Sequence, residues 1–232
     1  MARLMQPAEA KRGPRARSRD AVAAAYDLRG RTPRNLWVVY SAKTGRDWVL
    51  ASDRQLVHWA VALEGDCSVR SFELLCDDAA SATGERSRRP DALVVRTDGV
   101  HEHHWVGVSA SGPDQDASST SAAAAAGPGM PIERRFSDTD LQPMGVQAVR
   151  WLKVAACAAS IRDVRHAALE AELGAAVKRL SMGVLSDLLR TTAGYDPTLA
   201  VCMACRLAVT GRLQLDLTAV SFGYSTPWRA SQ

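Results

Sequence analysis

The chain has 232 residues, of which 47% are hydrophobic and 23% charged, and its formal net charge is +4. This composition predicts a globular protein and excludes a chain that is disordered throughout. No apolar run approaches the roughly 20 residues that span a bilayer, and the basic amino terminus lacks the apolar segment of a secretory signal. We therefore expect a cytoplasmic protein with no membrane partner, whose five cysteines stay reduced.

Positive charge is concentrated at the amino terminus. Residues 1–35 contain nine Lys and Arg against three Asp and Glu, whereas the remainder of the chain has a small net negative charge. A basic arm with few apolar residues is expected to be disordered alone and to bind a polyanion, here DNA; a solubilising tail without a partner is the alternative. The predicted DNA-binding residues are Lys11, Arg12, Arg15, Arg17, Arg19, Arg31 and Arg34.

Two short runs rich in aromatic and β-branched residues follow the arm. They cover residues 36–40 (LWVVY) and 47–50 (DWVL), and Gly45 lies in the turn between them. Such runs around a glycine turn predict a β-hairpin.

A capped helix is predicted directly after this hairpin. Ser52 is a good N-cap, and Gln55 three residues later can complete a capping box. We predict a helix over residues 53–64, ended by Gly65, with an apolar stripe against the core. His58 lies off the stripe and is expected to face elsewhere. The stripe consists of Leu56, Trp59, Ala60 and Leu63.

Three more strands are predicted before the composition changes. Residues 68–75 alternate in polarity and predict a strand, and the polar residues 77–89 predict a loop. Residues 92–96 (ALVVR) and 103–110 (HHWVGVSA) flank a TDG turn and predict a second hairpin. The element order over residues 36–110 is therefore β-β-α-β-β-β.

The rest of the chain is predicted to be a linker and a helical domain. Residues 111–131 are rich in Ala, Ser, Gly and Pro and predict the linker, and residues 132–232 form the domain. Helix signals predict four helices: residues 145–161, a second from Asp163 to about Leu180, a third capped by Ser181, and a fourth that begins at Asp196 and Pro197 and is closed by Gly211. A strand pattern follows in residues 212–220 (RLQLDLTAV), so we predict a winged helix-turn-helix.

Short motifs in both parts of the chain carry a family resemblance. The S-x-x-Q frame at the predicted helix start is followed by L-E-x-D at residues 63–66 and V-x-S-F at residues 69–72. This arrangement resembles the amino-terminal nuclease domain of TnsA-like transposon endonucleases. The carboxy-terminal part is similar to the smaller domain of that family, through Trp151-Leu152 and the pattern L-A-x-x-x-x-C-R-L-x-x-x-G-x-L-x-x-D-L that ends at Leu217.

The resemblance implies an α/β fold with two domains. A restriction-endonuclease-like, mixed-sheet domain over residues 36–110 is followed by a small, mainly helical, winged-helix-like domain. The resemblance also implies a subunit of a heteromeric transposase, which binds transposon-end DNA and two protein partners. These partners are a DDE-type transposase subunit and an AAA+ ATPase regulator.

The resemblance further implies a nuclease site with four positions. A helix glutamate, an aspartate at the start of a strand and an [E/Q]-x-K pair would hold Mg²⁺ and assist hydrolysis. Asp91 matches the aspartate, whereas the other three positions hold Gln55, Gly107 and Ser109. A neutral amide is a poor ligand for Mg²⁺, and the lysine is missing, so we expect the nuclease to be inactive or impaired.

Two alternatives remain open. The first is an active metal-dependent endonuclease with a relocated site, in which Asp53, Glu73 or Glu102 joins Asp91 to bind Mg²⁺. The second is a winged-helix DNA-binding or adaptor protein with no role in transposition.

Histidine and cysteine groups also suggest zinc. Residues 101–104 (HEHH) are consecutive, but neighbours in a strand face opposite sides, so we favour a solvent-facing hairpin. Cys202 and Cys205 form a lone C-x-x-C inside a predicted helix, and we favour buried thiols.

The predicted recognition helix, residues 197–210, offers few side chains that read DNA bases. Thr198 lies near its start and Arg206 near its end. Major-groove readers instead carry several long polar side chains toward the amino end of this helix. We therefore expect the carboxy-terminal domain to bind protein partners rather than to read a DNA sequence.

Overall fold

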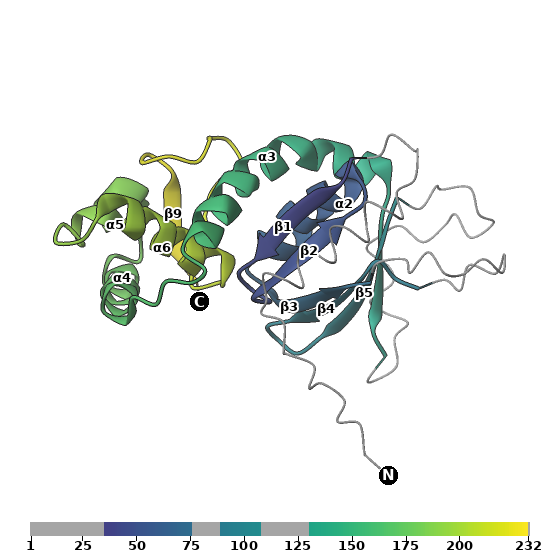
Figure 1. Ribbon diagram of the computed structural model, residues 1–232, viewed down its shortest axis with the longest axis horizontal. Helices are drawn as coiled ribbons and strands as arrows, with labels where there is room; N and C mark the ends of the chain where they lie inside the picture. Colours follow the sequence, from purple (N-terminus) through teal and green to yellow (C-terminus); the bar gives the residue numbers. More distant parts are fainter. Residues whose placement is uncertain (1–34, 76–88, 108–129, 232) are drawn as a thin grey trace, which may run out of the picture.

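The computed structural model describes residues 35–75, 89–107 and 130–231. It is a mixed α/β structure in which strands gather at one side and short helices at the other (Figure 1). One long helix, α3 (Asp138–Ser160), runs across the top of the view between the two sides. The α/β fold class with a mixed sheet is confirmed.

The first hairpin forms as the sequence predicts; the helix after it has the predicted bounds, but its second half is π-helical and the predicted capping box does not form. β1 (Trp37–Ser41) and β2 (Arg46–Leu50) pair antiparallel around a turn that contains Gly45. Gly45 has a φ of +65°, a conformation that glycine adopts without steric cost. The helix comprises α2 (Asp53–His58) and a π-helical continuation, η1 (Trp59–Glu64).

A close contact explains why glycine follows this helix. A Cβ atom on Gly65 would lie 2.7 Å from the Ala60 carbonyl oxygen and 2.8 Å from Cε2 of Trp151. Any larger residue would push α3 away from η1. Gly65 follows the last residue of η1, as predicted. Its lack of a side chain also lets α3 pack closely against η1.

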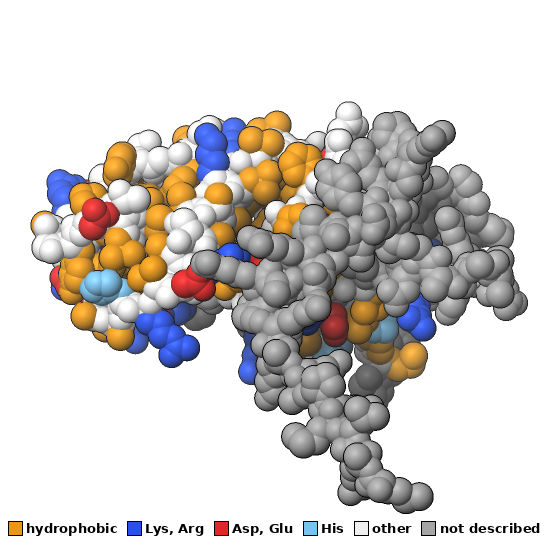
Figure 2. All heavy atoms as spheres, in the orientation of Figure 1, with side chains coloured by type: hydrophobic (Ala, Val, Ile, Leu, Met, Phe, Trp, Pro, Cys, Tyr) orange, Lys and Arg blue, Asp and Glu red, His pale blue; other side chains and the backbone are white. Residues whose placement is uncertain are grey.

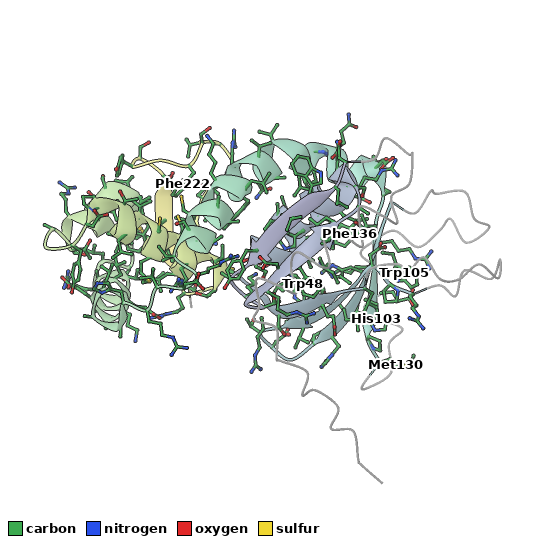
Figure 3. The ribbon with its side chains drawn as sticks, in the orientation of Figure 1. Trp48, His103, Trp105, Met130, Phe136 and Phe222 are labelled. Carbon is green, nitrogen blue, oxygen red and sulfur yellow. The ribbon has the colours of Figure 1, made fainter. Side chains whose placement is uncertain are left out.

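A four-stranded sheet lies beneath α2. Its order is β3 (Val69–Leu74), β4 (Ala92–Arg96), β5 (His101–Val106) and β6 (Ile132–Phe136). The first three strands are antiparallel, whereas β6 runs parallel to β5. Figure 3 shows His103 and Trp105 along β5, with Met130 near one end of the neighbouring strand and Phe136 at the other.

β6 was not predicted from the sequence. It lies beyond the predicted linker, so the predicted boundary at residue 132 divides one sheet. The parallel pairing needs a crossover of a dozen or more residues, and the chain between β5 and β6 is long enough to supply it.

α3 begins earlier than the predicted residue 145. Ser137 is its N-cap and forms a capping box with Asp140, so the helix starts at Asp138. Pro143 lies inside the helix rather than before it. Val146 and Val149 face solvent from α3, with 64% and 61% exposure, and Figure 2 shows hydrophobic side chains along this helix.

The carboxy-terminal part combines three helices with a small sheet. α4 (Ala167–Leu180), α5 (Leu185–Arg190) and α6 (Pro197–Val209) pack beside an antiparallel sheet of order β7-β9-β8. The strands are β7 (Met182–Val184), β8 (Leu213–Leu215) and β9 (Pro227–Ala230). The strand pattern predicted over residues 212–220 is therefore much shorter, and its partner β9 was not predicted.

In this part, the predicted helix end at about Leu180, the start at Asp196 and the closure at Gly211 are confirmed, whereas two predicted helix starts are wrong. Asp196 caps α6, because its Oδ1 accepts a hydrogen bond from the Leu199 N–H at 2.9 Å. Asp163 does not cap α4, which begins at Ala167. Ser181 is not an N-cap either: its φ is +63°, and the chain enters β7 before α5 begins at Leu185.

Candidate functional site

The start of α2 holds Gln55 in a fixed orientation. The Gln55 N–H donates to Ser52 Oγ at 3.2 Å, which confirms the predicted N-cap. Gln55 Oε1 accepts from the Ala51 N–H at 2.8 Å, one residue before the cap. The Gln55 side-chain carbonyl is thus bonded to the backbone at the helix start, and its NH₂ group points toward Asp91.

Asp91 meets Gln55 at the beginning of β4. Gln55 Nε2 lies 3.5 Å from Asp91 Oδ1, a long hydrogen bond. The Val106 N–H donates to Asp91 Oδ2 at 2.8 Å, and the Asp91 N–H donates to the His104 carbonyl at the same distance. The structure therefore brings together two of the residues that were predicted to form a nuclease site, Gln55 and Asp91, and places hydrogen-bond donors on both carboxylate oxygens.

Gly107 ends β5 beside the same helix turn. Its φ is +74°, and a Cβ atom there would lie 3.3 Å from Cδ of Arg54. Arg54 pairs with Asp138 at 2.5 Å, and both side chains are more than half exposed. Gly107 supplies no ligand, and the nearest cation is engaged at the start of α3. Ser109 lies outside the described residues.

The three carboxylates of the relocated-site alternative have other partners. Asp53 accepts hydrogen bonds from Asn35 and Trp37, which lower its pKa. Glu73 pairs with Arg46 at 3.9 Å, and Glu102 is buried on β5.

The residues present do not fit Mg²⁺. Within residues 35–75, 89–107 and 130–231, no group of three or more His, Cys, Asp or Glu side chains is arranged to hold a metal ion. Gln55 presents its amide Nε2 to Asp91 Oδ1 at 3.5 Å. Because Mg²⁺ prefers several oxygen ligands in octahedral geometry, an amide donor facing Asp91 opposes its binding.

A buried polar chain supports this site from beneath. His58 Nε2 lies 2.9 Å from His104 Nδ1, and His104 Nε2 lies 2.9 Å from Glu102 Oε2. Glu102 also pairs with Arg96 at 3.5 Å and with Arg134 at 3.3 Å. We name His58, His104 and Glu102 the histidine–glutamate chain.

The histidine–glutamate chain shows that two sequence predictions are wrong: the solvent-facing hairpin at residues 101–104, and His58 facing away from the core. His104 and Glu102 are only 1% and 4% exposed, so the hairpin strand is not solvent-facing at these positions. His58 is 2% exposed and lies against Phe136, with ring centroids 4.5 Å apart. The sequence pattern missed this contact because His58 and His104 are 46 residues apart.

Burial decides the charge state of the two histidines. Desolvation, reinforced by His104, lowers the pKa of His58 from 6.5 to about 3. Desolvation also lowers the pKa of His104, although Glu102 opposes this shift. Both rings are therefore neutral near pH 7, and the network connects α2 to β5 rather than presenting ligands to a metal.

A second polar cluster connects the first hairpin to the end of the helix. Glu64 accepts hydrogen bonds from Ser41 Oγ and the Ala42 N–H, each at 2.7 Å. Lys43 Nζ donates to the carbonyls of Leu63 and Asp66, and burial lowers its pKa to about 8. Burial raises the pKa of Glu64. These contacts fix the helix whose first turn carries Gln55.

A cavity of about 420 Å³ lies between η1, β6, α3 and the small sheet. Gly65, Trp151 and Arg134 line one part of it, and Gln214 and Arg229 line another. Arg134 pairs with Glu102, and Arg229 donates to Gln214, so both cations that face the cavity have partners. These elements are distant in sequence, and no local motif signals the cavity.

The predicted recognition helix, α6, is largely covered. Eight residues of α6 are buried, which confirms the expected burial of its C-x-x-C pair, and α3 packs along the helix. Arg206 donates to the carbonyls of Ile161 and Val164, so it holds the chain between α3 and α4. Thr198 is exposed at the helix start. The predicted DNA-binding residues of the arm lie outside the described residues.

Comparisons with protein-family models, curated proteins and solved structures found no match. In the described part of the chain, no helix combines the length and hydrophobicity needed to cross a membrane.

Proposed function

We propose that the protein is a TnsA-like subunit of a heteromeric DNA transposase, which binds transposon-end DNA and whose nuclease site is inactive or impaired. One observation carries the proposal: Gln55 and Asp91 meet at the family position, but an amide NH₂ faces the carboxylate at 3.5 Å. This contact supports a nuclease site whose position is kept but whose metal ligands are reduced.

Two features of the topology support this proposal. The strand that follows α2 leads into a mixed sheet, as in a restriction-endonuclease-like domain. In the carboxy-terminal part, the order α4, β7, α5, α6, β8, β9 with a β7-β9-β8 sheet supports a winged helix.

The covered α6 helix supports a role in partner binding rather than in reading DNA bases. Because Arg206 is engaged and most of α6 is buried, this helix offers little to the major groove. We assign non-specific DNA affinity to the basic arm, and we assign contacts with the DDE-type transposase and the AAA+ ATPase to the carboxy-terminal part. The alternative is a winged-helix adaptor unrelated to transposition; binding to a neighbouring ATPase, measured with the full chain, separates the two.

A Mn²⁺ titration of four full-length proteins, the wild type and three variants, tests the site. Gln55→Glu places a second carboxylate beside Asp91 and is expected to create measurable Mn²⁺ binding. The matched control is Gln142→Glu on the exposed face of α3, which adds the same charge elsewhere. Wild-type binding that Asp91→Ala abolishes would contradict the proposal, as would equal binding by both glutamate variants.

A further inference from the structure

A groove of about 640 Å³, which we name the hairpin groove, lies between the first hairpin and α3. Figure 1 shows α3 beside β1, and the two elements are in contact. Residues 37–40 of β1 line the groove, together with a face of α3 that includes Ala155 and Ala159. The helix formed by α2 and η1 contributes Leu56 and Trp59. A volume of this size is typical of sites that bind small organic molecules.

The lining of the hairpin groove is suited to an uncharged ligand. Its two charged residues, Asp47 and Arg162, pair with each other at 3.1 Å, and the Arg162 guanidinium lies 5.3 Å from the centre of the Tyr40 ring. The other lining residues are aliphatic or aromatic. Because the opposite charges are paired and the remaining walls are apolar, the groove favours a neutral, mainly hydrophobic molecule over an ion.

Trp59 brings an unused hydrogen-bond donor to this lining. The residue is 1% exposed, and within the part of the chain that the structure describes its indole Nε1 has no hydrogen-bond partner. The indoles of Trp37 and Trp48 differ, because they donate to Asp53 Oδ1 at 2.9 Å and to Thr44 Oγ1 at 3.0 Å. A buried donor without an acceptor is uncommon and costs free energy, so an acceptor on a ligand would restore the missing bond.

We propose that the hairpin groove binds an uncharged, mainly apolar small molecule that carries a carbonyl oxygen, and that Trp59 Nε1 donates a hydrogen bond to this oxygen. The apolar walls supply most of the affinity, and the single indole donor fixes the orientation of the ligand. The groove is separate from the candidate nuclease site, because Gln55 and His58 contact Asp91 and His104, whereas Trp59 lines the groove. Ligand binding here is therefore independent of the proposed role in transposition.

A fluorescence titration of the full-length protein with prodan tests the site. Prodan is an uncharged naphthalene with one ketone, and its emission shifts to the blue when it enters apolar surroundings. We expect saturable binding to the wild type. Trp59→Phe keeps an apolar ring but lacks the N–H, so it should weaken prodan binding by about 2- to 10-fold, the effect of one hydrogen bond.

Two controls separate the hydrogen bond from a general loss of packing. Trp105 on β5 also has a buried indole Nε1 without a partner in the described residues, but it does not line the hairpin groove. Trp105→Phe should therefore leave prodan binding unchanged. Dimethylaminonaphthalene, which is the same fluorophore without the ketone, should bind the wild type and Trp59→Phe with equal affinity.

A further variant locates the bound molecule and tests the site even if Trp59→Phe does not fold. Ala156 lines the groove from an exposed position on α3, so Ala156→Phe should fill the groove without disturbing the core and prevent prodan binding. The matched control is Ala168→Phe at an exposed position of α4, which should bind prodan as the wild type does. The proposal would be overturned by a wild type without saturable binding, by binding that Ala156→Phe leaves intact, or by equal prodan affinity in the wild type and Trp59→Phe.

Discussion

Replacing His58 with Gln should make the protein less sensitive to acid. In the folded protein the pKa of His58 is about 3, against 6.5 for an unperturbed histidine. The unfolded chain therefore binds a proton that the folded chain excludes, and stability is lost as pH falls below about 6.5. The loss approaches about 1.4 kcal/mol per pH unit, or about 2 kcal/mol between pH 7 and pH 5.

Urea unfolding followed by tryptophan fluorescence at about pH 7, 6 and 5 measures this effect. Wild type should lose about 2 kcal/mol more than His58→Gln over this interval, because carboxylates contribute equally to both proteins. The matched control is His101→Gln, at an exposed position on the same strand as His104. Equal pH dependence in wild type and His58→Gln would refute the reasoning, as would a His58 pKa near 6.5 measured by NMR.

Two further predictions concern packing and charge. Gly65→Ala should destabilise the protein by about 1–3 kcal/mol, because the added Cβ would lie within 3 Å of Ala60 and Trp151. The control is Gly145→Ala, where an added Cβ has nothing within 4 Å; it should stabilise α3 by about 0.5–1 kcal/mol in the same urea titration. Deleting residues 1–30 should reduce the slope of log K for DNA against log salt by several units, and an unchanged slope would show that the arm does not bind DNA.

Local signals in the sequence predicted what is local in the structure. The N-caps at Ser52 and Asp196 and the turn at Gly45 depend on hydrogen bonds or backbone angles within a few residues. The meeting of Gln55 and Asp91 was expected only through the family resemblance, and the structure places the two in contact.

Features that depend on distant contacts were missed. β6 has the sequence IERRF, which lacks an alternating apolar pattern because its middle residues are exposed, and its pairing partner lies on the other side of a long crossover. His58 was expected to lie off the core because the apolar stripe was identified from the helix sequence alone. That pattern contains no information on β5, whose His104 and Glu102 provide the polar partners that permit burial of His58.

A plasmid-nicking assay with parallel DNA-binding measurements tests the central claim most directly. The full-length protein, with Mg²⁺ or Mn²⁺, should bind DNA in a salt-dependent manner but nick supercoiled plasmid no more than Asp91→Ala does, since Gln55 and Gly107 supply no carboxylate. Nicking by the wild type that Asp91→Ala abolishes would contradict the account.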